Sequence, residues 1–206
     1  MIEAFSFKNA HLFGDALASQ ARLRYRVFVE HRGLSHKHYD GMEYDEFDTP
    51  AALYLVWRDK NAEVRGMFRI IPTNTPYMLE QYWPYLCQGR SLPRDPLIWE
   101  MGRVCVDRTY PWSKRKRIVP ELLCALQELC RANNVSAVLG VTRPHLVNHY
   151  IEAGVDWLGP AAEIEGEQEA AFWIPSQNLR PHAHCARLSI PQSVLSLEPI
   201  ATRIAA

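Results

Sequence analysis

Apolar and polar positions follow two periods in the first part of the chain, and each period predicts an element. Helical spacing over Leu17–Val29, followed by a glycine, predicts an amphipathic helix with Arg24 and Phe28 on one face. Strand-type runs at Ala51–Arg58 and Glu63–Ile71 are separated by four residues. That spacing predicts an antiparallel hairpin.

The rest of the chain alternates strand and helix patterns. The predicted elements are a short helix or turn over Pro76–Leu86, a strand over Leu97–Val106, a helix over Lys114–Ala132 with the apolar stripe Ile118, Leu122, Leu126 and Leu129, a strand over Val135–Thr142, a helix over His145–Ala153 and a strand over Ala170–Ile174. In the strand at 97–106, period-two alternation places Trp99, Met101 and Arg103 on one face and Glu100, Gly102 and Val104 on the other. Strands first and then alternating helices and strands indicate an α+β fold, a mixed α/β sandwich.

Between the first helix and the hairpin lies a polar, acid-rich stretch from His36 to Pro50. Glycine and proline punctuate it, so we expect an ordered loop or lid. Its length indicates a functional segment rather than a simple connection.

Length and composition limit the possible classes. The 206 residues fit a single domain, 1–206, with residues 191–206 expected as a loose C-terminal tail. Lys plus Arg and Asp plus Glu both total 23, so no overall field favours nucleic acid. There is no signal-peptide pattern and no apolar run long enough for a bilayer, which leads us to expect a cytoplasmic protein.

The cysteines and histidines give no metal-site pattern. Five scattered cysteines without a CxxC pair argue against a disulfide framework or zinc site, and we expect them in the core. His36 with His38, and His182 with His184 and Cys185, have metal-like spacings but lack a third ligand. We therefore predict no metal.

Charged residues beside apolar runs are the most informative feature of the first half of the sequence. They are Arg24, Glu43, Asp45, Asp48, Arg69, Glu100 and Arg103. Charged side chains are rarely buried unless they are paired, so this placement indicates a partly desolvated network. Such a network can be a structural salt-bridge cluster, or a pocket for a substrate with cationic and carboxylate ends, such as an amino acid derivative. In the second case Glu100 could serve as a general base for an amine.

A second charged feature is the run Lys114, Arg115, Lys116 and Arg117 at the start of a predicted helix. Cations there oppose the helix dipole. The run either forms a solvated face or docks an acidic partner or a phosphate.

Four ordered motifs resemble the acyl-homoserine-lactone synthases, the bacterial autoinducer synthases. RLRYRVFVEHRGL resembles the family's first helix, with Arg24 and Phe28 on motif positions. GMEYDEFDTPAALYL is similar to its acidic loop, VRGMFRIIPTNTPYML supplies Arg69, and IWEMGRVCVD supplies Glu100 and Arg103. Departures from the family pattern are Leu34 for Trp, Trp83 for Phe and Gly102 for Ser.

The resemblance implies a GNAT-like acyltransferase fold, a central mixed sheet with a V-shaped split and helices on both faces. It implies acylation of the S-adenosylmethionine amine from a thioester on acyl carrier protein or CoA, then lactone closure with release of methylthioadenosine. S-adenosylmethionine is a substrate there and no cofactor is expected. The implied catalytic residues are Glu100, Asp45 and Arg69, and the implied substrate-binding residues are Arg24, Phe28, Leu34, Asp48, Trp83, Arg103 and Thr142. Thr142 would contact a 3-oxo group, or would be a helix N-cap.

In the same interpretation the cations 114–117 would dock the carrier protein, and the protein would be a monomer. Two alternatives remain open. One is a GNAT-like N-acyltransferase that acts on another amine and forms no lactone. The other is a non-catalytic relative that binds a nucleoside or carrier protein. A nucleic-acid reader using the basic run is disfavoured by the zero net charge.

Overall fold

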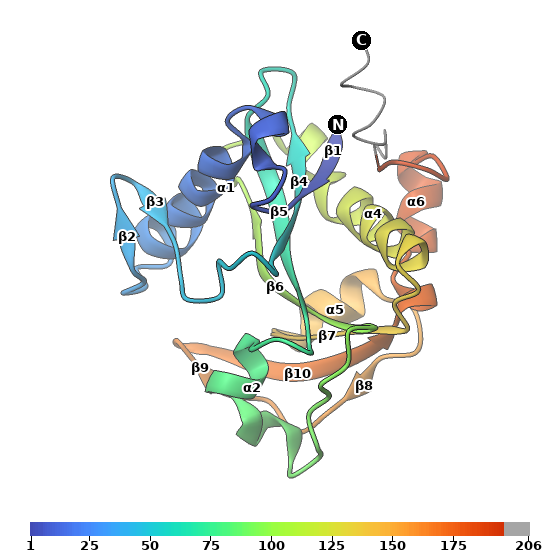
Figure 1. The fold of residues 1–206 in the computed structure, drawn as a ribbon. Coiled ribbons are helices and arrows are strands. Elements are labelled where there is room, and N and C mark those ends of the chain that lie inside the picture. The colour runs from blue at the N-terminus through green and yellow to red at the C-terminus, as the bar shows by residue number, and fades with distance from the viewer. Residues whose placement is uncertain (196–206) are drawn as a thin grey trace.

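The computed structural model describes residues 1–195, which contain a mixed eight-stranded sheet and a small two-stranded sheet (Figure 1). The strands are β1 (Ile2–Phe5), β2 (His38–Tyr39), β3 (Met42–Glu43), β4 (Leu53–Arg58), β5 (Val64–Pro72), β6 (Ile98–Val106), β7 (Ala137–Thr142), β8 (Asp156–Trp157), β9 (Ala162–Ile164) and β10 (Glu167–Pro175). The large sheet runs β1–β4–β5–β6–β7–β10–β8, with β9 paired to β10, and β2 pairs β3 separately. Within the described residues, β6 and β7 are parallel and the other paired strands are antiparallel.

The α-helices are α1 (Ala16–Arg24), α2 (Met78–Tyr82), α3 (Trp112–Arg115), α4 (Ile118–Ala132), α5 (Pro144–Tyr150) and α6 (His182–Leu188). A π-helical segment, Tyr25–His31, continues α1, and 3-10 turns occupy Ala10–Phe13, Pro84–Cys87 and Ser176–Asn178. Figure 1 shows α1 with the β2–β3 hairpin on one side of the β4–β5–β6 region and α4 on the other. A mixed sheet with helices on both sides agrees with the predicted α+β sandwich.

Each face of the sheet carries its own core because successive strand residues point to opposite faces. Leu23 of α1 packs with Tyr54 and Val56 on one face. Leu122 and Leu126 of α4 pack with Phe68 on the other face. The charged cluster described below lies on the α1 face.

Most elements predicted from periodicity are confirmed. The hairpin is β4–β5, the strand at 97–106 is β6, and the apolar stripe 118–129 lies in α4 with Ile118, Leu122 and Leu126 fully buried. The predicted start of that helix was wrong. Lys114 and Arg115 lie in the separate helix α3, and Lys116 and Arg117 lie between α3 and α4. The four cations therefore do not all oppose the dipole of a single long helix. The stretch 36–50, expected as a loop, contains the β2–β3 hairpin.

The alternation predicted for β6 fails at Arg103. The register between β5 and β6 shifts between Met67 and Arg69, opposite Cys105 and Gly102, and Arg103 has φ +48°. The shift inserts an extra residue in β6, a β-bulge, which redirects the side chains that follow it. Arg103 consequently reaches the acidic loop on the α1 face, the same face as Glu100.

The pairing of β6 with β7 ends at Glu100 and Leu139. One residue further, a Cβ on Gly140 would lie 2.5 Å from the Met101 carbonyl oxygen and 2.9 Å from the Phe172 ring. Only glycine fits this close approach. Beyond it the two strands are no longer paired, and the sheet splits between β6 and β7.

The last described residues are held against the body of the protein, unlike the loose tail expected from residue 191. Leu195 is buried and bridges to Ile2, and Glu128 accepts hydrogen bonds from the backbone amides of Val194 and Leu195. Residues 196–206, the remainder of the expected tail, lie outside the described residues.

Two smaller findings concern the cysteines and membrane spans. All five cysteines are buried and free, which confirms their predicted place in the core. Helices long and apolar enough to cross a bilayer are absent from residues 1–195.

Candidate active site

Arg24 is the centre of the buried charged cluster on the α1 face. It is the last residue of α1, and its side chain is fully buried. Its Nη1 and Nη2 donate to the two oxygens of Asp48 at 2.7 and 2.9 Å, and its Nε donates to Glu43. The planar guanidinium therefore ties two carboxylates from opposite ends of the acidic loop to one helix.

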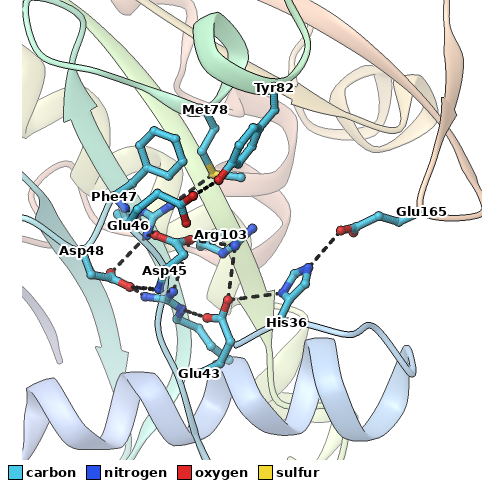
Figure 2. Close-up of polar contacts among 12 residues, drawn as sticks. His36, Glu43, Asp45, Glu46, Phe47, Asp48, Met78, Tyr82, Arg103 and Glu165 are labelled. Carbon is cyan, nitrogen blue, oxygen red and sulfur yellow. Dashed lines mark hydrogen bonds and ion pairs between the residues drawn. The ribbon is translucent and has the colours of Figure 1, made fainter. Parts of the chain in front are cut away.

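Asp45 and Asp48 extend the cluster to the sheet. Arg69 of β5 donates from Nη1 to Asp45 and, at 3.1 Å, to Asp48, while Arg103 of β6 places Nη2 2.7 Å from Asp45. Tyr54 of β4 donates its hydroxyl to Asp48 at 2.7 Å. Helix, loop and three strands therefore converge on Asp45 and Asp48. Figure 2 shows these two carboxylates with Arg103 and Glu43.

The charges within the cluster fix its protonation states. Burial disfavours the charged form of Glu43, but its contact with His36 and the charges of Arg24 and Arg103 outweigh burial and hold its pKa at about 2. Burial acts likewise on Asp48, but the hydrogen bonds and charge of Arg24, with the charge of Arg69, lower its pKa well below the usual range. Both groups are carboxylates near neutral pH.

Glu100 lies beside the cluster in a different environment. It is 3% exposed, and its two oxygens accept the backbone amides of Met78 at 2.9 Å and Leu79 at 2.7 Å, at the start of α2. Burial raises its pKa, against the lowering effect of those two amides and of Arg69 and Arg103. Each carboxylate oxygen has a second lone pair, so these hydrogen bonds leave acceptor capacity.

A cavity of about 340 Å³ adjoins the cluster. The side chains lining it are His36, Lys37, Glu43, Tyr44, Asp45, Glu46, Met78, Tyr82, Trp83, Arg103 and Glu165. Trp83, implied as substrate-binding by the resemblance, lies in a wall of this cavity, whereas Leu34 packs against the core of the α1 face. We call this space the small cavity.

Polar groups without partners face this region. Asp45 Oδ2, Glu43 Oε1 and Arg103 Nε are buried and make no hydrogen bond of good geometry within residues 1–195. Arg103 Nη2 lies within ion-pair distance of both carboxylates, and His36 Nδ1 lies 3.2 Å from Glu43 Oε1. Buried polar groups normally have partners. A ligand that carries both an amine and a carboxylate would satisfy them.

A larger cavity of about 1020 Å³ opens along the split between β6 and β7. Its interior is apolar and includes Phe68, Val119, Leu123, Val147, Phe172 and Ile174. Phe28 lines it and also stacks on Arg103, whose guanidinium carbon is 5.4 Å from the ring centroid. Since Arg103 lines the small cavity, the two cavities adjoin across this pair.

Thr142 ends β7 and lines the large cavity. The N-cap of α5 is Arg143, without a side-chain capping bond, so the N-cap alternative for Thr142 is wrong. Thr142 is partly exposed there.

The basic run divides into different environments. Arg115 and Lys116 line the large cavity, and Lys114 lies over the Tyr110 ring. Arg117 pairs with Glu121 at 2.7 Å and donates to the Leu188 carbonyl. Arg117 thus ties α4 to α6.

Sequence reasoning missed His36, Glu165 and Tyr82 as site residues. His36 lies between Glu43 and Glu165, and Tyr82 donates its hydroxyl to Glu46 (Figure 2). Glu165 is 129 residues from His36, and no local pattern predicts such a pairing. Clusters of three or more His, Cys, Asp or Glu able to hold a metal are not found in residues 1–195.

The sequence model of the autoinducer synthases matches residues 12–157. This match covers well over half of the chain. The chain belongs to the autoinducer synthase family. It is therefore an acyltransferase.

Curated relatives agree with this assignment. The chain is 34% identical over 168 residues to the isovaleryl-homoserine lactone synthase of Bradyrhizobium diazoefficiens, covering 80% of this chain and 75% of the relative. It is 29% identical over 186 residues to an acyl-homoserine-lactone synthase of Pseudomonas aeruginosa, covering 87% and 89%.

Among solved structures, the chain is similar to the CoA-dependent acyl-homoserine lactone synthase BjaI in complex with S-adenosylmethionine and isopentyl-CoA. The TM-score is 0.83 at 31% identity, covering 95% of this chain and 92% of BjaI.

Proposed function

We propose that this acyl-homoserine-lactone synthase takes S-adenosylmethionine in the small cavity and a coenzyme A thioester in the large one. The observation that carries the proposal is the junction of the two cavities at Phe28 and Arg103. An amine held beside Asp45 would meet a thioester carbonyl held in the β6–β7 split. The ligands of BjaI support the same pair of substrates.

The small cavity suits the charges of S-adenosylmethionine. Arg103 lines it with an unpaired Nε and can bind the substrate carboxylate, while Glu43 and Asp45 attract the ammonium and sulfonium groups. Trp83 and Tyr82 offer aromatic faces for the adenine. Arg24 and Arg69 are buried among acids and hold this arrangement together.

Catalysis requires that the substrate ammonium lose a proton before it attacks. Glu100 is the base in this proposal because burial raises its pKa toward the working range of a general base. Asp45 lines the cavity, and in this proposal it passes the proton through water to Glu100, which lines neither cavity. Arg69 keeps Asp45 oriented through its ion pair.

The proposed reaction has two chemical steps, acyl transfer and lactone closure. The amine nitrogen bonds to the thioester carbonyl carbon, the carbon–sulfur bond breaks, and the thiolate leaves and takes up the proton that the nitrogen loses. The substrate carboxylate then attacks the carbon next to the sulfonium, which closes the lactone. The second carbon–sulfur bond breaks and neutral methylthioadenosine is released.

The choice of donor rests on the charge of the large cavity. The cations that line it are Arg32, Arg108, Arg115, Lys116, Arg143 and Arg187, and no Asp or Glu among the described residues lines it. Trp112 also lines the large cavity, and 67% of its surface is exposed, so it lies at the rim of the cavity. Coenzyme A has a pyrophosphate, a 3′-phosphate and an adenine to match these groups, whereas a carrier-bound phosphopantetheine has one phosphate.

The deciding experiment compares one acyl group on three carriers, with isovaleryl among the first acyl groups tried. We expect methylthioadenosine and an N-acyl-homoserine lactone, with the highest kcat/KM on CoA and lower values on acyl carrier protein and pantetheine. Higher kcat/KM on the carrier protein would overturn the donor assignment. Acyl transfer without methylthioadenosine would indicate another amine substrate.

A double variant tests the rim directly. Arg115→Ala with Lys116→Ala should raise KM for acyl-CoA about tenfold and leave acyl-pantetheine unchanged, because only the former has the nucleotide phosphates. Arg131→Ala, an exposed cation at the end of α4, is the matched control. Equal effects on both donors would contradict a nucleotide contact.

Variants of the two acids test the base. Glu100→Gln and Asp45→Asn should each lower kcat by about 10²-fold or more in folded protein. Normal turnover in folded Glu100→Gln would remove Glu100 from the mechanism.

A further inference from the structure

His36 is held between two carboxylates at the edge of the small cavity. Its Nε2 makes a 2.9 Å hydrogen bond with Glu165 Oε1 (Figure 2). Its Nδ1 lies within ion-pair distance of Glu43 Oε1, at 3.2 Å, without hydrogen-bond geometry. The side chain is 13% exposed. A neutral imidazole has one N–H and an imidazolium has two. Only the protonated ring can face both carboxylates with a donor.

The surrounding charges favour the imidazolium. The hydrogen bond to Glu165 and the contact with Glu43 outweigh burial and the charge of Arg103, and so raise the pKa of His36. On the neighbouring elements the ring of Phe28 packs 5.7 Å away. We call the contact of His36 with Glu43 and Glu165 the bridge. The cations facing it are Arg103, Arg32 and Lys37. Arg32 Nη2 is 3.9 Å from Glu165, and Lys37 lines the small cavity.

The bridge joins two distant parts of the chain. Glu43 belongs to β3 and to the buried cluster of Arg24, whereas Glu165 occupies the two-residue turn between β9 and β10. Both carboxylates and His36 line the small cavity. The contact therefore fastens the acidic loop to the β9–β10 turn across the cavity.

The turn itself is strained in a way that serves this contact. Glu165 has φ +49°, a left-handed conformation that glycine or asparagine adopts far more readily than glutamate. Strain of this kind persists where surrounding structure enforces it, and it often marks a functional position. Here it points the Glu165 carboxylate at His36 (Figure 2).

We propose that His36 is a positioning residue whose imidazolium holds Glu43 and Glu165 together and keeps the small cavity closed around S-adenosylmethionine. The inference rests on the proposed function only in naming that substrate. When the ring loses its proton, two carboxylates face each other with one donor between them, and the turn is released. The bridge is thus complete below the raised pKa of His36 and is lost as pH rises through it.

Steady-state kinetics between about pH 6 and pH 9 test the role in catalysis. In the wild type, KM for S-adenosylmethionine should rise about tenfold across the titration of His36, with the acyl-donor KM unchanged. His36→Gln should show the high KM at every pH. His36→Arg should keep a low KM without the rise, because a guanidinium stays charged and can donate to both acids. His38→Gln, two residues away and exposed, is the control.

Nuclear magnetic resonance of the histidine rings tests the bridge by a measurement that does not depend on enzyme activity. Protons should be found on both nitrogens of His36 below its titration midpoint. Glu165→Gln should lower that midpoint while leaving the midpoint of His38 unchanged. Glu165 lies on the exposed turn, so its variant remains informative if changes at His36 prevent folding. The inference is overturned if Glu165→Gln moves neither the midpoint nor KM, or if His36→Gln retains the wild-type pH dependence. Absence of lactone synthesis would contradict the proposed function and leave the ring titration as the test of the bridge.

Discussion

Arg24 and Asp48 form a bidentate pair with both partners almost completely buried. The two nitrogen–oxygen distances are 2.7 and 2.9 Å, and the side chains are 0% and 4% exposed. This geometry requires a planar fork of donors, which only arginine supplies. The pair anchors the acidic loop to α1 before any substrate arrives.

We therefore expect Arg24→Lys to be strongly destabilising. One ammonium cannot reach Glu43 and both oxygens of Asp48, so at least one buried carboxylate oxygen would lose its arginine hydrogen bond. Breaking a buried pair in this way costs about 3–5 kcal/mol of unfolding free energy, measurable by urea denaturation. Arg22→Lys is the matched control because Arg22 and Asp15 are exposed, and it should change stability by less than about 1 kcal/mol. Similar losses in both variants would show that burial of the Arg24 pair is not the cause.

Stability should also fall at acid pH through Glu43. Its pKa is about 2 in the folded protein against an ordinary value of 4.5. A lowered pKa stabilises the fold above the ordinary value, and this contribution of roughly 3 kcal/mol is lost as pH falls from about 4.5 toward 2. Asp48, whose pKa is also lowered, likewise makes the fold less stable as pH falls. Glu100, whose pKa is raised, has the opposite effect on stability.

The measurement is the urea midpoint at several pH values for the wild type and Glu43→Gln. The variant should be less stable near neutral pH and should lose less stability on acidification. Glu163→Gln, at an exposed position on β9, should follow the wild-type curve. Parallel curves for Glu43→Gln and the wild type would contradict the assignment.

Much of the site could be predicted from residue types and local spacing. Arg24, Asp45, Asp48 and Arg69 each stand beside an apolar run, and buried charges of both signs must pair. Periodicity also found β4, β5, β6 and the stripe of α4, because long elements repeat their pattern many times.

What the sequence could not predict depends on irregular backbone or on distant pairing. Arg103 reaches the acidic loop because a single bulge reverses the alternation of side chains in β6. No residue type in this strand predicts the position of that bulge. Strands β8 and β9 have two and three residues, too few for a period. Glu165 meets His36 only because β10 lies near the site in three dimensions.

Gly140 should be essential to the start of the sheet split. A Cβ there would lie 2.5 Å from the Met101 carbonyl oxygen, and a backbone atom in a sheet cannot move aside cheaply. Gly140→Ala should cost about 1–3 kcal/mol in urea unfolding. At Gly102 a Cβ would meet only the Met78 sulfur at 3.7 Å, an ordinary contact, so Gly102→Ala should be tolerated. Equal tolerance at both positions would show that the split can adjust.

Thr142 should influence which acyl chains the enzyme prefers. It ends β7 at the wall of the large cavity, where its hydroxyl could donate a hydrogen bond to a 3-oxo group. Thr142→Val keeps the shape and removes the donor, so the preference for a 3-oxo donor over the unsubstituted donor of equal length should fall about three- to tenfold. Thr142→Ser retains the hydroxyl and should retain the preference. The check is a competition assay with both donors in one reaction, read as the ratio of the two lactones by mass spectrometry. An unchanged ratio in Thr142→Val would mean that Thr142 forms part of the cavity wall but does not distinguish a 3-oxo acyl chain from an unsubstituted one.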